Sequence, residues 1–278
     1  MLENLDKPLP ADPIDLVAID LDGTLLRSDG KICPTSVKAI ATARKVGVKV
    51  VLASGRAPRR IQRFQRMLGL DTLQIGHDGA LVYDGDPERA IHHQPLSSLV
   101  ARRVVDLALS VAPSILIGLE IVDMCYTNSA DNRIRAQSAA GPEARHSASL
   151  DPHLSGPVTK ILLVGKTAAL GGVHAALAGD LGDQVAFTFS DMNLLQIVHA
   201  TVDKRTALQR VAKHYDVPRG GVMAIGDAPN DVGMLTWAGL GVVMQNSWPD
   251  VRAAAQFVVP SNDEGGVAHA FEKYVLRR

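Results

Sequence analysis

The sequence predicts an α/β protein with a mainly parallel sheet, into which a smaller α+β module is inserted. Three observations support this prediction. Short apolar runs alternate with segments of helical periodicity in the first part of the chain, the same alternation returns near the C-terminus, and the middle follows another pattern. The chain has 278 residues, enough for two domains that each bury a hydrophobic core.

The N-terminal part of the predicted core alternates strands and helices. The apolar run 14–19 ends in an acidic, glycine-containing turn, which is typical of a buried strand. The next segment has helical periodicity and stops at Gly47, while Pro58 stands in the first turn of a second helix, where its missing N–H costs little. Strands joined by helices in this way form a parallel sheet through right-handed crossovers. The predicted elements are strands at 14–19 and 48–53, helices at 36–46 and 58–68, and a strand–turn–strand segment at 72–83.

The alternation returns after the middle of the chain, so we expect one core domain made of residues 1–84 and 189–278. Its second part has predicted strands at 194–198, 222–225 and 240–243, and predicted helices at 204–215 and 230–237. Residues 85–188 are predicted to form the inserted α+β module. The predicted strands of this module are 115–119, 121–126 and 158–164, and its predicted helices are 96–111, 130–139 and 168–181.

Composition excludes several classes of protein. The 29 Lys and Arg residues balance the 29 Asp and Glu residues, so no overall charge attracts nucleic acid or an acidic membrane. The two cysteines, Cys33 and Cys125, are too few and too far apart for a disulfide framework or a metal site. No apolar run approaches the roughly 18 residues of a membrane span, and the N-terminus lacks a signal-peptide pattern. We therefore expect a cytoplasmic protein without a membrane or nucleic-acid partner; nothing in the sequence indicates its oligomeric state.

Polar residues follow four of the predicted core strands. Ligands of open α/β sheets bind outside the carboxyl ends of the strands, so these residues are expected to converge on one site. They are Asp20 and Asp22 after 14–19, Ser54 and Gly55 after 48–53, Lys204 after 194–198, and Asp227, Asn230 and Asp231 after 222–225.

These residue types fit a phosphoryl site. Up to four carboxylates close together are costly unless a cation neutralises them, and hard oxygen ligands favour Mg²⁺. Lys204, the Ser54 hydroxyl and the amides of Ser54 and Gly55 would supply donors for an anion. An aspartate can then act as the nucleophile that attacks phosphorus. Taken singly, Asp20 could belong to an acidic turn that caps a helix, Lys204 could be a solvated helix residue, and Asp231 could cap the next helix.

The motifs resemble those of the haloacid dehalogenase superfamily. Asp20-Leu21-Asp22-Gly23-Thr24-Leu25 is similar to motif I, Ser54-Gly55-Arg56 to motif II, Lys204 to motif III, and Gly226-Asp227 with Asn230-Asp231 to motif IV. Their order and spacing, and the continuation into Met234-Leu235 and Ala238-Gly239-Leu240-Gly241-Val242, resemble the Cof-type, IIB subfamily of sugar-phosphate phosphatases. The resemblance implies a Rossmann-like three-layer core and an inserted α+β cap of the C2 type.

The same resemblance implies a Mg²⁺-dependent phosphatase that hydrolyses a small phosphomonoester, such as a sugar phosphate, bound between core and cap. Asp20 would be the nucleophile that forms an aspartyl-phosphate. Asp22 would give its backbone carbonyl to the metal, and its side chain would protonate the leaving oxygen and later activate water. The implied substrate-binding residues are Leu21, Ser54, Gly55, Lys204 and Asn230. The implied metal-site residues are Asp20, Asp22, Asp227 and Asp231, of which Asp231 would contact the metal ligands and not the metal itself.

The chain departs from the subfamily pattern in several places, some of which carry a charge. Asp78 stands where asparagine is common, and its carboxylate could repel an anionic substrate or reshape the hinge of the cap. Arg205 follows Lys204 where glycine is common. Candidates for substrate selection cluster near the expected central turn of the cap: Asp123, Tyr126, Asn128, Arg133 and Arg135.

Two other functions remain open at this point. A phosphotransferase or phosphomutase would use the same aspartyl-phosphate and pass its phosphoryl group to a sugar. A phosphometabolite-binding protein without turnover would keep the fold, but the presence of Asp20, Asp22, Lys204 and Asp227 argues against it.

Overall fold

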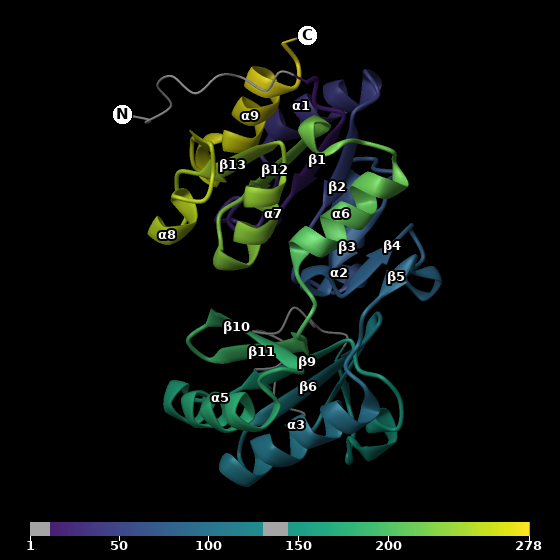
Figure 1. Cartoon of the computed structure of the whole chain (residues 1–278), viewed down its shortest axis with the longest axis vertical. Helices are drawn as coiled ribbons and strands as arrows, with labels where there is room; N and C mark the ends of the chain where they lie inside the picture. Colours follow the sequence, from purple (N-terminus) through teal and green to yellow (C-terminus); the bar gives the residue numbers. More distant parts are fainter. Residues whose placement is uncertain (1–11, 130–143, 278) are drawn as a thin grey trace. The chain divides into compact units, whose positions relative to one another are not determined.

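The computed structural model describes residues 12–129 and 144–277 (Figure 1). The chain forms two compact units. The first contains the chain up to Ser54, Gln62–Gly79 and the chain from Asp203 onward, and the second contains Gly55–Ile61 and Ala80–Val202. None of the described helices has both the length and the apolar character that a membrane span requires.

The first unit is built on a five-stranded sheet in which every pair of neighbours is parallel. β1, β12 and β13 are buried along their whole length, as expected for parallel strands that helices cover on both faces. In order across the sheet, the strands are β14 (Phe257–Val259), β13 (Leu240–Met244), β12 (Val222–Gly226), β1 (Leu16–Ile19) and β2 (Lys49–Leu52).

The helices of the first unit lie in two layers. The chain moves from β1 to β2 in one direction along the sheet and from β12 to β13 in the other. Right-handed crossovers therefore put α1 (Pro34–Lys45) and α7 (Val232–Trp237) on opposite faces. α1 packs against α9 (Gly266–Tyr274), and α7 packs against α6 (Lys204–His214) (Figure 1). The reversal falls between β1 and β12, and open α/β sheets bind their ligands at such a point.

Three further elements have residues in the first unit. β3 (Gln74–Gly76) continues it through a parallel bridge between Ala53 and Ile75. The helices are α8 (Pro249–Arg252) and α2 (Pro58–Met67), whose residues up to Ile61 belong to the second unit and whose residues from Gln62 belong to the first.

The second unit contains a six-stranded, mainly antiparallel sheet. β7 and β8 are its one described parallel pair. Outside this sheet, β4 (Leu81–Tyr83) and β5 (His92–His93) pair antiparallel. In order across the sheet, the strands are β10 (Val185–Asp191), β11 (Leu194–His199), β9 (Lys160–Val164), β6 (Leu116–Ile121), β7 (Met124–Thr127) and β8 (Arg145–His146).

Two helices, α3 (Ser98–Val111) and α5 (Thr167–Leu181), pack against each other and share an apolar core with this sheet. The core draws on both helices and on the inward side chains of the strands, including Val104, Ile117, Leu163, Leu177 and Ile197. Each unit therefore has its own core, and the predicted α/β class with a parallel sheet and a separate α+β part is confirmed.

One predicted strand lies in the wrong sheet. The run 194–198 was expected in the parallel core, but β11 is antiparallel to β10 and β9 in the second unit. A two-residue turn at Met192 and Asn193 joins β10 to β11, so local hairpin pairing decides its place. The apolar run suits either sheet, and the chain returns to the first unit only at Asp203. The division into domains at 84/85 and 188/189 stays a prediction, and the helix predicted at 130–139 falls outside the described residues for most of its length.

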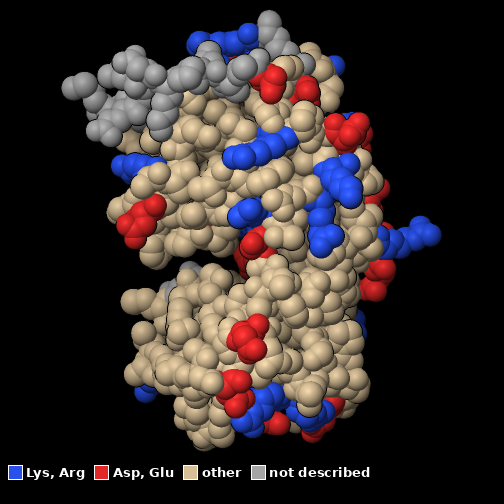
Figure 2. Space-filling view, in the orientation of Figure 1, with Lys and Arg blue, Asp and Glu red and all other residues tan. Residues whose placement is uncertain are grey.

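Charged side chains of both signs are interspersed on the face drawn in Figure 2, among its described residues. This distribution agrees with the equal numbers of acidic and basic residues in the sequence.

Candidate active site

The loop after β1 carries Asp20 to the edge of the sheet. Its backbone N–H donates to the carbonyl of Ile225 on β12 at 3.0 Å, which continues the parallel pairing by one residue. Leu21 is fully buried, and its carbonyl accepts from the backbone N–H of Leu26 at 2.8 Å. Gly23 has φ +80°, and a Cβ there would lie 2.3 Å from a carboxylate oxygen of Asp227. Glycine at this turn therefore lets the loop approach the end of β12.

The loop after β12 supplies two buried aspartates. Asp227 Oδ1 accepts from the hydroxyl of Thr24 at 2.7 Å, which ties this loop to the loop after β1. Asp231 Oδ2 accepts from the backbone N–H groups of Asp227 and Ala228 at 3.0 and 3.1 Å. Asp231 thus holds the backbone that carries Asp227.

Lys204 connects the two loops. Its Nζ donates to Asp20 Oδ1 at 2.6 Å and to Asp231 Oδ1 at 2.7 Å, and its side chain is only 1% exposed. Lys204 is the first residue of α6, and the preceding Asp203 caps that helix by accepting from the N–H of Thr206 at 2.5 Å. The helix start therefore aims the ammonium group at the carboxylates.

The electrostatics of this cluster favour a cation. Asp20, Asp227 and Asp231 each offer an oxygen, and these oxygens all lie within 4.8 Å of one another. Burial raises the pKa of Asp20 well above its usual value, Lys204 opposes this shift, and Asp231 and Asp227 add to it. Burial alone would lower the pKa of Lys204, but the nearby carboxylates raise it well above its ordinary value. One ammonium among several carboxylates leaves excess negative charge that a divalent cation could neutralise.

The remaining predicted residues lie in different surroundings. Asp22 is exposed, but its charge raises the pKa of Asp227, so the two carboxylates are electrostatic neighbours. Ser54 is buried at the end of β2, and its backbone N–H donates to the carbonyl of Ile75 at 2.9 Å. This amide therefore has a backbone partner, and the expected substrate-binding role of Ser54 stays a prediction. Gly55 belongs to the second unit, where its carbonyl accepts from the ammonium of Lys160.

Asn230 makes a contact that the sequence did not predict. Its Nδ2 donates to Asp78 Oδ1 at 2.9 Å, and Asp78 is itself 6% exposed. The hydrogen bond from Thr24 to Asp227 was also not predicted. Thr24 lies within the first motif, and that position is the sequence signal that could have pointed to a role in the site. The Asp78 contact had no local signal, because the two residues are 152 positions apart.

Three of the specificity candidates have structural partners in the second unit. Asp123 Oδ1 accepts from the backbone N–H of Arg59 at 2.6 Å. Tyr126 stacks on His153, with ring centroids 3.7 Å apart, and Asn128 Oδ1 accepts from the N–H of Ile117 at 2.8 Å. Arg133 and Arg135, the other two candidates, fall outside the described residues.

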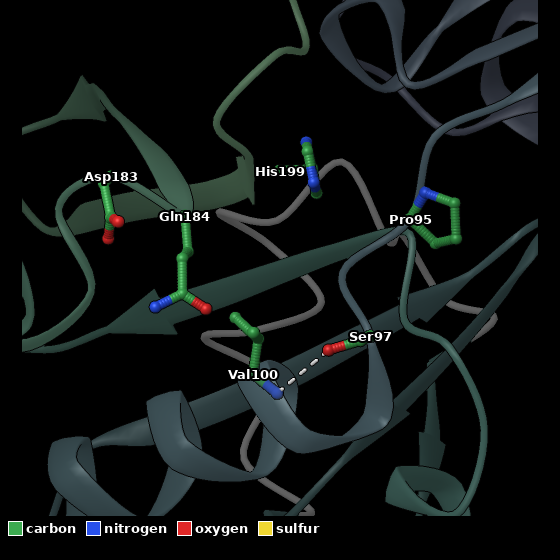
Figure 3. A pocket seen from close by; sticks show the side chains of 6 residues that line it. All are labelled: Pro95, Ser97, Val100, Asp183, Gln184 and His199. Carbon is green, nitrogen blue, oxygen red and sulfur yellow. Dashed lines mark hydrogen bonds between the residues drawn. The ribbon is translucent and has the colours of Figure 1, made fainter.

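A cavity of about 460 Å³ in the second unit has different chemistry (Figure 3). The Ser97 hydroxyl that lines it already accepts from the N–H of Val100 at 3.3 Å and so caps α3. The described residues of the lining include a single carboxylate and no lysine or arginine, so they do not resemble the cluster around Lys204. The lining residues are Pro95, Ser97, Val100, Asp183, Gln184 and His199.

A known protein family matches most of the chain. A family model described as haloacid dehalogenase-like hydrolase matches residues 17–271. The chain belongs to this family. The predicted resemblance, the Cof-type subfamily included, is thus confirmed, and so is the predicted enzyme class, a phosphoric monoester hydrolase.

Two relatives of this haloacid dehalogenase-like hydrolase match over nearly their whole length. The putative phosphatase YxeH of Bacillus subtilis is 28% identical over 271 residues, which cover 95% of this chain and 99% of the relative. The 5-amino-6-(5-phospho-D-ribitylamino)uracil phosphatase YitU of the same organism is 26% identical, with 93% and 97% covered. A solved haloacid dehalogenase-like hydrolase of Bacteroides thetaiotaomicron superposes with a TM-score of 0.86 at 26% identity, covering 94% of this chain and 99% of that one. The fold is therefore the predicted Rossmann-like core with a C2-type cap.

Proposed function

We propose that this hydrolase is a Mg²⁺-dependent phosphatase that releases phosphate from a small phosphomonoester through an aspartyl-phosphate on Asp20. The observation that supports it most is the placing of Lys204 between Asp20 and Asp231, at the point where the order of the strands reverses. A carboxylate nucleophile beside a fixed cation and a group of metal-binding oxygens is what phosphoryl transfer requires.

The described side chains fit a magnesium site. Both oxygens of Asp231 are already engaged, one by Lys204 and the other by two backbone N–H groups. Among the described residues, one carboxylate oxygen of Asp227 is engaged, by the hydroxyl of Thr24. We therefore infer that Asp20 and Asp227 hold the ion directly, with the backbone carbonyl of Asp22, while Asp231 fixes their positions. The ion would neutralise the carboxylates and polarise a phosphoryl oxygen.

The chain's own residues would divide the reaction into two displacements. In the first, a carboxylate oxygen of Asp20 forms a bond to phosphorus, and the ester oxygen leaves with a proton from Asp22. In the second, Asp22 takes a proton from water, the water oxygen attacks phosphorus, and Asp20 is released with inorganic phosphate. Of the three N–H donors of the Lys204 ammonium, two bond to carboxylates of the described residues, and we expect the third to donate to a phosphoryl oxygen.

The substrate is expected to be a small phosphorylated metabolite such as a sugar phosphate. The name of YitU gives it a phosphorylated ribityl compound as substrate, which supports a small phosphate ester here too. A cytoplasmic location stays a prediction.

The test is hydrolysis of p-nitrophenyl phosphate by the wild type with Mg²⁺, by the wild type with EDTA, and by Asp20→Asn with Mg²⁺. We expect turnover only in the first case, and an acid quench during turnover should trap phosphate on the wild type alone. Asp20→Asn should keep a cooperative thermal transition, because asparagine keeps the shape of the side chain. Turnover by folded Asp20→Asn would overturn the mechanism, and turnover in EDTA would overturn the metal requirement.

A further inference from the structure

The turn after β3 places a carboxylate beside the proposed site. Residues His77–Gly79 form a 3₁₀ turn in which Asp78 has φ +60°, a conformation that aspartate tolerates better than most residues. The N–H of Asp78 donates to the carbonyl of Ser54 at 3.1 Å. A Cβ on Gly79 would lie 2.3 Å from the carbonyl oxygen of Asp203, so this turn is packed tightly against the start of α6. Asp78 is therefore held in place from both sides.

The carboxylate of Asp78 fixes which way the Asn230 side chain is turned. An ionised carboxylate accepts hydrogen bonds but cannot donate them. The 2.9 Å contact from Asn230 Nδ2 to Asp78 Oδ1 therefore needs the amino group of Asn230 toward Asp78, and its carbonyl oxygen points elsewhere. An asparagine at position 78 could donate or accept, so it would allow either orientation of Asn230.

Asp78 also acts on Lys204. Its negative charge adds to those of Asp20 and Asp231 in raising the pKa of the Lys204 ammonium. Asp78 thus bonds to Asn230 and acts on Lys204 through its charge, and the family resemblance gives both of these residues substrate contacts.

We propose that Asp78 is a positioning residue, which holds the Asn230 amide in one orientation for the phosphoryl substrate. This inference rests on the proposed function. Removing the carboxylate while keeping its shape, as in Asp78→Asn, should lower kcat about tenfold, the effect of one charge-assisted hydrogen bond. KM should stay the same or fall, because a negative charge near an anionic substrate is lost.

The decisive test is a double-mutant cycle on Asp78→Ala and Asn230→Ala, with kcat and KM for p-nitrophenyl phosphate in Mg²⁺. If Asp78 acts through Asn230, Asp78→Ala lowers kcat in the wild type and leaves it unchanged in the Asn230→Ala background. Equal losses in both backgrounds would overturn the proposal. Asp71→Asn, an 87% exposed side chain of the same unit, controls for the loss of one negative charge and should leave kcat unchanged.

Two further readouts keep the test decisive. If Asp78→Ala does not fold, the same double-mutant cycle is measured with Asp78→Asn in its place. Thermal unfolding shows which variants are native. If the wild type has no turnover, the proposed function fails, and the cycle is read from the Kd of inorganic phosphate in Mg²⁺. A loss of phosphate affinity that depends on Asn230 would then support the positioning role, and an independent loss would overturn it.

Discussion

Burial raises the pKa of Asp227 to about 6; the hydroxyl of Thr24 and the ammonium of Lys204 oppose this shift, and the charges of Asp231 and Asp22 add to it. The unfolded chain titrates this carboxyl near the reference value of 3.8. Because the folded pKa is the higher one, ionisation of Asp227 destabilises the folded state. The penalty is absent below the unfolded pKa and reaches its full size once the pH has passed the folded pKa.

Asp227→Asn should therefore stabilise the metal-free protein at neutral and higher pH. A shift of about two units corresponds to on the order of 3 kcal/mol at pH 8, which is an upper bound, and to roughly half of that at pH 5. Urea unfolding in EDTA at the two pH values measures the difference. A variant that is less stable than the wild type at pH 8, or equally shifted at both pH values, would contradict the assignment.

Metal addition gives the matching control for this prediction. Mg²⁺ should raise the Tm of the wild type more than that of Asp227→Asn, because the variant has lost a carboxylate that a cation would neutralise. Equal rises would place the ion away from Asp227.

At the scale of elements, the N-terminus of α6 determines where Lys204 lies. Asp203 caps this helix, and Gly79 approaches the Asp203 carbonyl so closely that no side chain fits there. The helix start is therefore fixed by one hydrogen bond of its own and by packing against a turn far away in the sequence.

Removing the cap tests this dependence. Asp203→Ala should cost about 1 kcal/mol of stability and should also lower kcat, because fraying of the first turn moves Lys204. Ser97→Ala removes the cap of α3, so it should cost a similar amount and leave kcat unchanged. Chemical denaturation and steady-state kinetics measure the two effects. An unchanged kcat in Asp203→Ala would show that packing alone holds Lys204.

At the scale of the whole molecule, what an ion pair contributes to stability depends on whether it is buried or exposed. In the second unit, Arg59 forms a two-pronged ion pair with Glu120 at 3.1 Å, with side chains 9% and 1% exposed. Burial raises the pKa of Glu120, while the charges of Arg59 and Lys160 oppose the shift. An exposed pair with two hydrogen bonds, Arg103 with Asp180, lies in the same unit.

Removing the carboxylate from the buried pair should cost much more stability than removing it from the exposed pair. Glu120→Ala should destabilise the second unit by about 3 kcal/mol, because it removes the two-pronged partner of the buried Arg59 charge and leaves the Asp123 carboxylate at 3.7 Å as its nearest described acid. Asp180→Ala should change stability little, because water solvates the guanidinium that remains. Hydrogen exchange of the core amides in β6 and β9 locates the loss. Equal effects of the two substitutions would show that burial does not govern these pairs.

The sequence by itself determined the parallel core and the positions of the four motifs that follow its strands. Buried parallel strands such as β1 and β12 are unbroken apolar runs, and the polar turn after each run is a local signal. Asp20, Asp227 and Asp231 were therefore predicted to meet, and their oxygens lie within 4.8 Å. The likeness of four motifs to one family gave the roles proposed for them.

Tertiary structure decided what no local pattern contains. The run that forms β11 suits a parallel or an antiparallel sheet equally well, and pairing with β10 assigned it to the second unit. The partners of Lys204, Asn230 and Arg59 lie 27 to 184 residues away in the chain. Periodicity reports which face of an element is buried, whereas the choice of a buried charge's partner depends on how distant segments pack.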